Sequence, residues 1–318
     1  MKAIGFHAPG GPSVLTVLDL PTPQAGPGEV RVRVHAAAVN PADTLVRAGD
    51  VDLSAMPGPY VPGMDVAGVV DQAGGGSGFA VGDAVMAVVV PDRPHNGGYA
   101  QYVVVPAGQV TRAPRNVGPF EAATVPMNGL TALRALRVLE VGAGSAVAVT
   151  GSAGAFGGFF LQLGLAAGAR VVADAGEADE ALVRGLGAEL VARRGPGWTA
   201  GVRELVPGGV GALADGALLG PAALDAIADD GAYAALRAPG ERGTAPMPRP
   251  APRGIAYRHV AFHENPDVPG GLRALADAVE AGRLTPRVAE VIGPADLARA
   301  HAAVEAGGVR GRFVVDLG

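Results

Sequence analysis

The sequence has no cysteine, few aromatic residues and few charged ones. Its 318 residues include 4% aromatic and 17% charged side chains. The absence of cysteine excludes disulfides, thiol nucleophiles, iron–sulfur clusters and every zinc site that needs a thiolate ligand. Apolar residues make up 49% of the chain, which supports a substantial buried core and argues against disorder despite 50 Gly and 27 Pro. The length predicts two domains, or one large one.

Positive charge is scarce as well. With 25 Lys+Arg against 30 Asp+Glu the net charge is −5, so a nucleic-acid-binding protein is not expected. The first residues contain no apolar run of signal-peptide length, which predicts a cytoplasmic location. Residues 141–169 carry no charge and could suggest a membrane span. Their glycines, and the break at Thr150, Gly151 and Ser152, favour instead a buried strand, a tight turn and a buried helix, so no membrane association is expected.

The pattern of apolar residues changes along the chain. In the first hundred or so residues it predicts short strands at 30–34, 66–70, 84–90 and 99–105, separated by Gly- and Pro-rich turns. After residue 119 it predicts a helix at 121–140, and then strands at 146–149, 170–173 and 189–192 that alternate with helices up to 168 and at 177–186. Alternation at this spacing is typical of a parallel, doubly wound sheet. The pattern closes with helices at 272–282 and 295–306 and a strand at 312–317, and the Pro-rich segment 245–252 predicts a loop or a crossover between domains.

The strongest local motif lies at 147–157, where a buried strand runs into glycines spaced three apart and a helix follows at once. Gly151, Gly154 and Gly157 allow a tight turn, close approach to a pyrophosphate and close packing of helix on strand. The free N–H groups and the positive end of the helix dipole then favour an anion. This pattern predicts a dinucleotide site; the alternative is a plain tight turn in a Gly-rich sheet.

Six further segments stand in one order along the chain. They are AVNPAD at 38–43, VPGMDVAGVV at 61–70, FAVGDAV at 79–85, GGYAQY at 97–102, NGLTA at 128–132 and RGRFVV at 310–315. With the glycine turn between the last two, the chain resembles, nearly end to end, the zinc-independent quinone oxidoreductases of the medium-chain dehydrogenase/reductase superfamily. The resemblance implies an α/β fold with a central Rossmann dinucleotide-binding domain at 120–257. It also implies a β-rich GroES-like catalytic domain split between 1–119 and 258–318.

The resemblance also implies an activity. It implies an NADPH-dependent reductase that transfers hydride, without zinc, to a quinone or an α,β-unsaturated carbonyl, and a homo-oligomer such as a homodimer. One alternative is an enoyl reductase acting on thioester intermediates of polyketide or lipid assembly. Another is a crystallin-like protein that binds the cofactor and catalyses little. No zinc is expected, because zinc-dependent relatives have Cys in the place of Asn40 and His in the place of Met64.

The resemblance places Asn40 and Thr131 beside the nicotinamide, where an amide can orient the ring or hydrogen-bond the acceptor oxygen; a turn residue before a proline is the alternative for Asn40. Asp43 and Asp65 are expected to be structural hydrogen-bond acceptors. Members of the family often have a Tyr where this chain has Val51, so no obvious proton donor is present. Tyr60 is the candidate substitute, and the alternative is a packing role in the core.

The second half of the dinucleotide site decides between NADPH and NADH. The place of the acid that binds the ribose in NAD-preferring folds falls on Ala175, and Asp174 stands one residue earlier. Arg194 could pair with a 2′-phosphate, although the acidic residues around it oppose this. We therefore expect NADPH, with NADH as the alternative. The predicted cofactor-binding residues are Gly151, Ser152, Gly154, Ala155, Phe156, Gly157, Asp174, Arg194 and Arg312.

One metal-like spacing is discounted. His259 and His263 stand four apart, as ligands on a helix would, but 255–262 is predicted as a strand and loop and no third ligand is near in sequence. No metal site is therefore expected.

Overall fold

The computed structural model describes the chain except residues 55, 91–92, 238–240 and 261–267. The described residues form two compact units. Unit 1 comprises 1–127, 267–281 and 286–318, and unit 2 comprises 128–266 and 282–285. The domain boundaries expected from the sequence, at 119/120 and 257/258, stay a prediction.

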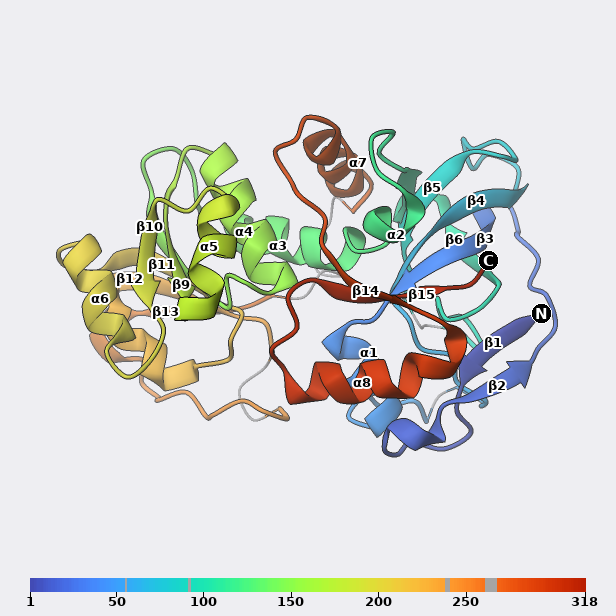
Figure 1. Cartoon of the computed structure of the whole chain (residues 1–318), viewed down its shortest axis with the longest axis horizontal. Coiled ribbons are helices and arrows are strands. Elements are labelled where there is room, and N and C mark those ends of the chain that lie inside the picture. The colour runs from blue at the N-terminus through green and yellow to red at the C-terminus, as the bar shows by residue number, and fades with distance from the viewer. Residues whose placement is uncertain (55, 91–92, 238–240, 261–267) are drawn as a thin grey trace. The chain divides into compact units, whose positions relative to one another are not determined.

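Unit 1 is built around a sheet that takes strands from both ends of the chain. Its order is β14-β15-β3-β4-β5-β7, and β6 also pairs with β3. The strands are β3 (Glu29–Ala38), β4 (Asp65–Ala73), β5 (Ala84–Val88), β6 (Tyr102–Pro106), β7 (Val110–Arg112), β14 (Val288–Ile292) and β15 (Arg312–Asp316), and a separate pair joins β1 (Lys2–Gly5) to β2 (Thr16–Asp19). In Figure 1 the red β15 lies beside the blue β3, with which it pairs antiparallel. The expected β-rich domain made from the two chain ends is confirmed.

Alternating side chains explain why these strands form one core. On β3, Val30, Val32 and Val34 are fully buried, whereas the arginines between them are more exposed. Because neighbouring residues of a strand point to opposite faces, this period of two places the valines on the core side of the sheet. They join a cluster that also takes Phe313 and Val315 from the C-terminal strand.

The helices of unit 1 correct one expectation. They are α1 (Pro41–Ala48), α2 (Pro119–Ala122), α7 (Val268–Glu280) and α8 (Leu297–Ala306), and α3 (Pro126–Val138) continues into unit 2. The single helix predicted at 121–140 is wrong, because it is two helices, α2 and α3. Pro126 explains the break: proline has no N–H to continue a helix and disfavours helical backbone in the residue before it.

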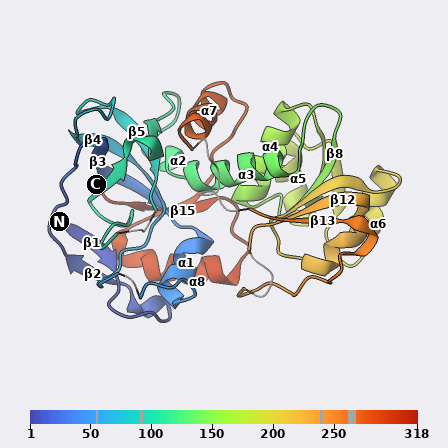
Figure 2. The ribbon, with the colours of Figure 1, turned by 180° about the vertical axis from the view of Figure 1, so that it is seen from behind.

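Unit 2 contains six parallel strands in the order β10-β9-β8-β11-β12-β13. They are β8 (Ala146–Thr150), β9 (Arg170–Ala175), β10 (Leu190–Arg193), β11 (Val210–Asp215), β12 (Ile227–Ala235) and β13 (Ala256–His259). Figure 2 shows β12 and β13 running side by side. This is the strand order of a Rossmann fold, in which ligands bind at the carboxyl ends of the strands, where the order reverses between the first and fourth strands. The predicted doubly wound sheet is confirmed.

Three helices of unit 2 each follow a strand in the chain: α4 (Ala155–Ala166) follows β8, α5 (Glu180–Gly185) follows β9 and α6 (Trp198–Leu205) follows β10. The uncharged stretch 141–169 contains β8 and α4, as expected. Among the described residues, no helix has both the length and the apolar character needed to cross a membrane. The Pro-rich segment 245–252 lies between β12 and β13 inside unit 2, so it is a loop and not a crossover between the units.

Candidate functional site

The glycine turn of unit 2 joins the end of β8 to the start of α4. Gly151 has a left-handed φ of 70°, which suits a residue without Cβ, and Gly154 is the N-cap of α4 without a side-chain cap. The first N–H groups of a helix have no partner within the helix. At α4 these donors, together with the positive end of the helix dipole, are suited to bind a phosphate.

Gly157 keeps the turn and the helix in close contact. A Cβ on this residue would lie 2.3 Å from the carbonyl oxygen of Gly151 and 2.6 Å from its carbon. Backbone atoms cannot yield to such a clash without moving the turn. Gly157 therefore allows the helix to pack closely on the turn, and the close packing of helix on strand expected from the sequence stays a prediction.

A buried carboxylate holds the turn to the next strand. Asp174, on β9, accepts a hydrogen bond from the Ser152 N–H (2.8 Å), and the Asp174 N–H donates to the Ser152 Oγ (3.0 Å). Both residues are almost inaccessible to solvent. Asp174 thus fixes the backbone of the turn. The structure brings these two residues together, and their contact with a dinucleotide stays a prediction.

Arg194 completes this cluster. Its Nε donates to the second Asp174 carboxylate oxygen (2.8 Å), and its Nη1 lies 3.6 Å from Asp179. The Arg194 side chain is 41% exposed, so a cation stands accessible beside the end of β9, where the strand closes with the small, buried Ala175. Arg193, the neighbouring cation, pairs with Glu177.

Ala155 and Phe156 lie buried in the first turn of α4. The Phe156 ring packs against Phe160, with centroids 6.1 Å apart, and a Cβ on Gly216 would come within 2.8 Å of it. Phe156 therefore contributes to the packing around the glycine turn, and its predicted contact with a dinucleotide stays a prediction.

A second buried carboxylate, missed by the sequence analysis, fixes the loop after β11. Asp215 accepts hydrogen bonds from the Thr150 hydroxyl (2.5 Å), the Gly220 N–H (2.8 Å) and the Tyr233 hydroxyl (2.6 Å). Burial, with the Asp215 charge next, raises the pKa of Tyr233, so its hydroxyl keeps the proton that it donates. An acidic residue at the end of a buried apolar strand was the available signal.

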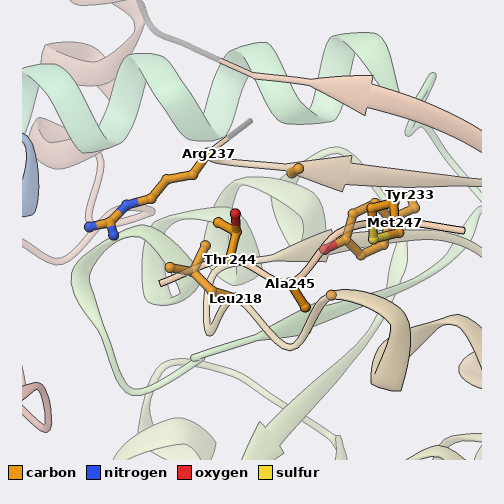
Figure 3. A pocket seen from close by; sticks show the side chains of 8 residues that line it. Leu218, Tyr233, Arg237, Thr244, Ala245 and Met247 are labelled. Carbon is orange, nitrogen blue, oxygen red and sulfur yellow. The ribbon is translucent and has the colours of Figure 1, made fainter. Parts of the chain in front are cut away.

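A hollow of about 250 Å³, open solvent included, lies beside this loop. Its lining comes from Leu218, Gly220, Tyr233, Ala235, Arg237, Thr244, Ala245 and Met247. Figure 3 shows these side chains, with the Arg237 guanidinium extending away from the apolar ones. Leu218 and Gly220 follow β11, and Tyr233 and Ala235 lie near the end of β12, so the hollow is at the carboxyl edge of the sheet.

In unit 1 the predicted residue Asn40 belongs to a buried polar network. Asn40 is the N-cap of α1 and is inaccessible to solvent. Its N–H donates to Asp43 (2.8 Å) and its Nδ2 donates to Asp65 (2.8 Å). Asp43 also accepts from the Tyr99 hydroxyl (2.7 Å), and Asp65 from the Met127 N–H (2.7 Å). Both carboxylates are structural acceptors, as expected, and they fix the orientation of the Asn40 amide.

The two carboxylates have strongly altered acidity. Burial raises the pKa of Asp43 to about 6, and hydrogen bonds from Asn40 and Tyr99 act in the opposite direction. Burial raises the pKa of Asp65 to about 7, and the nearby Asp43 charge adds to the rise. Both groups therefore titrate near neutral pH, where ordinary aspartates are fully ionised.

The remaining predicted residues lie in both units. Arg312 is on β15 in unit 1; burial lowers its pKa to about 10, and the Asp65 and Asp43 charges oppose this. Tyr60, also in unit 1, packs on Phe6 and donates its hydroxyl proton to the Met56 carbonyl (3.1 Å). Thr131 lies half-buried on α3 in unit 2. The functional roles expected for these residues stay predictions.

Of the two histidines with metal-like spacing, only His259 lies within the described residues. His259 ends β13, and His263 lies outside the described residues. In the part of the chain that the structure describes, no group of three or more His, Cys, Asp or Glu side chains could hold a metal ion.

Comparison with known proteins agrees with this architecture. The model of the alcohol dehydrogenase GroES-like domain matches residues 26–115, and that of the zinc-binding dehydrogenases matches 186–315. A chloroplast envelope quinone oxidoreductase homolog of Arabidopsis thaliana is 32% identical over 200 residues, which is 60% of each chain. Human quinone oxidoreductase is 34% identical over 179 residues, which is 55% of this chain and 53% of the human protein. The chain thus spans between half and two thirds of the length of these curated relatives.

Two solved structures match over almost the whole length. An NAD-dependent alcohol dehydrogenase has a TM-score of 0.89 at 32% identity, and the match covers 100% of both chains. A mycobacterial protein solved in complex with NADPH has a TM-score of 0.84 at 30% identity, covering 99% of each chain. With the strand order of unit 2 and the split sheet of unit 1, these likenesses show that the chain belongs to the quinone oxidoreductase-like family of the medium-chain dehydrogenase/reductase superfamily.

Proposed function

We propose that the protein is an NADPH-dependent reductase that transfers hydride to a quinone or to the β-carbon of an α,β-unsaturated carbonyl, without zinc. The observation that carries the proposal is the glycine turn at the N-terminus of α4, where a Cβ on Gly157 would meet backbone. Two relatives, a quinone oxidoreductase of Homo sapiens and an NADPH-dependent alkenal/one oxidoreductase of Arabidopsis thaliana, support the acceptor class.

The residues of unit 2 fit a dinucleotide. The α4 N–H groups, with Gly154 and Ser152 beside them, would hold the pyrophosphate. Asp215 and Tyr233 hold the loop that lines the hollow at the carboxyl edge, which would take the nicotinamide half. Bound NADPH supplies the hydride.

The acceptor must be polarised without a metal. The chain has no cysteine, and the zinc-ligand places of its zinc-dependent relatives hold Asn40 and Met64, so hydrogen bonds take over this role. In our proposal Asn40 and Thr131 orient the nicotinamide and the acceptor oxygen. Asp65 accepts from the Asn40 Nδ2 and so holds that amide in one orientation.

We propose that Arg194 makes the protein bind NADPH in preference to NADH. Its accessible guanidinium can pair with a 2′-phosphate, and the carboxyl end of β9 has Ala175 where an acid would repel that group. The mycobacterial structure with bound NADPH supports this choice. We further propose a homodimer, which sedimentation of the purified protein tests.

The test is NADPH oxidation by the purified protein, followed by absorbance, with a panel of quinones, then enones, then crotonyl-type thioesters. Turnover with quinones or enones above thioesters is expected. Turnover with thioesters alone would favour the enoyl reductase alternative, and none with any acceptor would favour a binding protein. In an active protein, Asn40→Ala should lower turnover far more than NADPH affinity, and equal turnover would remove Asn40 from the site.

A further inference from the structure

Asp174 stands on a strand that lies between two others. Its strand, β9, pairs with β8 on one side and with β10 on the other. Ser152 lies in the turn after β8, and Arg194 directly follows β10, where its N–H donates to the Ala175 carbonyl (2.8 Å). Because the strands are parallel, these residues meet at the carboxyl edge of the sheet, where ligands bind in a Rossmann fold.

The two oxygens of the Asp174 carboxylate bind two different partners. Oδ1 accepts from the Ser152 N–H (2.8 Å), and Oδ2 accepts from the Arg194 Nε (2.8 Å). The Asp174 side chain is only 2% exposed. In NAD-preferring folds an acid at the end of the second strand binds the ribose hydroxyl, which requires a carboxylate that faces the ligand. Asp174 is inaccessible and has both oxygens engaged within the protein, so it acts through its two neighbours.

The bond to Ser152 belongs to a reciprocal pair. The Asp174 N–H donates to the Ser152 Oγ (3.0 Å), and that hydroxyl donates to the Val149 carbonyl (3.1 Å). Ser152 is inaccessible to solvent, so its polar groups depend on partners inside the protein. These hydrogen bonds fix the second residue of the glycine turn, and with it the backbone that leads to the N-terminus of α4.

Arg194 is held by the same carboxylate and still reaches solvent. Its side chain is 41% exposed, and within the described residues Nε makes the one hydrogen bond of the guanidinium. Nη1 lies 3.6 Å from Asp179, which is buried like Asp174. In this cluster the two carboxylates are therefore hidden from solvent, and the guanidinium is the accessible charge. A guanidinium has five N–H donors, so Arg194 can bind a phosphate while Asp174 holds it.

We propose that Asp174 is a positioning residue that joins the glycine turn to Arg194, so that the sites for the pyrophosphate and the 2′-phosphate of NADPH are held as one unit. This rests on the proposed function, in which unit 2 binds NADPH. The Asp174 charge also opposes a phosphate, but it is buried and paired with Arg194. Ordering a flexible arginine before the ligand arrives removes an entropy cost of binding, and we expect this effect to exceed the repulsion.

The decisive variant is Asp174→Asn, which keeps the turn and releases the arginine. The amide oxygen of asparagine can still accept from the Ser152 N–H, whereas its NH2 group cannot accept from Arg194. We expect NADPH affinity, measured by calorimetry, to fall about 5-fold, the effect of ordering one flexible side chain, and NADH affinity to change much less. Glu177→Gln is the matched control, because it removes an acid near the same edge that pairs with Arg193 instead (3.0 Å) and should leave the ratio of affinities unchanged.

Two further variants separate positioning from a general effect on the fold. The double variant Asp174→Asn, Arg194→Gln should bind NADPH as weakly as Arg194→Gln alone, because no arginine is left to release. Arg194→Lys leaves Asp174 in place and keeps the charge, but it lacks the planar fork that Asp174 orients, so it should also bind NADPH more weakly than the wild type. Adenosine 2′,5′-bisphosphate and AMP, which differ only in the 2′-phosphate, should show the same pattern.

Four results would overturn the positioning role. They are additive losses in the double variant, tighter binding of NADPH by Asp174→Asn, equal losses for NADPH and NADH in that variant, and wild-type affinity for NADPH in Arg194→Lys. A wild-type protein that binds neither cofactor would contradict the proposed function itself, and the positioning role with it.

Discussion

Both units use buried carboxylates to hold backbone, but in different surroundings. In unit 2, Asp174 and Asp215 each accept from a loop N–H and lie at the ends of different strands, one with an arginine and the other with two hydroxyls. In unit 1, Asp43 and Asp65 also accept from backbone N–H groups, but they share Asn40 and influence each other's charge. In unit 2 the two carboxylates therefore hold the backbone of the glycine turn and of the loop after β11 in place. The network of unit 1, by contrast, is sensitive to protonation near neutral pH.

The glycine turn at Gly151, Gly154 and Gly157 is tested by Gly157→Ala, which we expect to have the largest effect of the variants. The new Cβ would meet the Gly151 carbonyl at 2.3 Å, so the turn must move away from the α4 N-terminus. We expect NADPH affinity measured by calorimetry to fall at least about 100-fold, or about 2.7 kcal/mol. Gly185→Ala is the control, because a Cβ on that helical glycine meets nothing within 4 Å. Unchanged affinity in Gly157→Ala would remove the turn from the dinucleotide site.

The packing of unit 1 is tested at the ion pair between α1 and α8, which lie together in Figure 2. Arg47 is almost fully buried and pairs with Glu305, whose side chain is 33% exposed. Glu305→Ala leaves the arginine charge buried without its carboxylate and should destabilise unit 1 by about 2–3 kcal/mol.

The control is Glu290→Ala, which breaks the exposed pair with Arg299 and should have little effect, because solvent screens exposed ion pairs. Amide hydrogen exchange of α1 and α8 measures both effects. Equal protection in the two variants would show that burial of Arg47 has no energetic consequence.

Protonation in unit 1 is tested by Asp65→Asn. The folded pKa values of Asp43 and Asp65, about 6 and 7, lie above the ordinary 3.8. Their protonated forms therefore stabilise the fold fully below about pH 4, and this contribution is lost as pH rises through 7. Asparagine at 65 should reduce the fall in unfolding free energy between pH 4 and 7 by about 3 kcal/mol.

Hydrogen exchange of the β3 and β4 amides, corrected for the intrinsic rate at each pH, measures this fall. Asp52→Asn is the control, since the hydrogen bonds from Ser54 lower the pKa of that exposed carboxyl and its contribution has the opposite sign. A profile as steep in Asp65→Asn as in the wild type would show that Asp65 is ionised throughout.

The smallest expected effect concerns the choice of cofactor. Arg194→Gln should weaken NADPH by about 10-fold, since one charge-assisted pair is lost, and NADH by much less. Arg193→Gln, at the neighbouring arginine paired with Glu177, should leave the ratio unchanged. Parallel loss of both cofactors in Arg194→Gln would mean that Arg194 acts only by holding Asp174.

The sequence allowed the glycine turn and the parallel sheet to be predicted, because these depend on local spacing and on counting along strands. It named Ser152, Asp174 and Arg194 as candidates, but not the hydrogen bonds that join them. The partners in unit 1 could not be found in this way. Tyr99 lies 56 positions from Asp43, and Arg47 lies 258 positions from Glu305. Periodicity within one element carries no information about pairs that only the folded sheet and helices bring together.

The central claim is that unit 2 holds a nicotinamide dinucleotide and that Arg194 favours NADPH. The most direct measurement is titration of the purified protein with NADPH and with NADH, followed by nicotinamide fluorescence. We expect saturable binding of both cofactors, with NADPH bound more tightly than NADH. Binding of neither would mean that the turn at Gly151, Gly154 and Gly157 is only a turn, and the reductase proposal would fail with it.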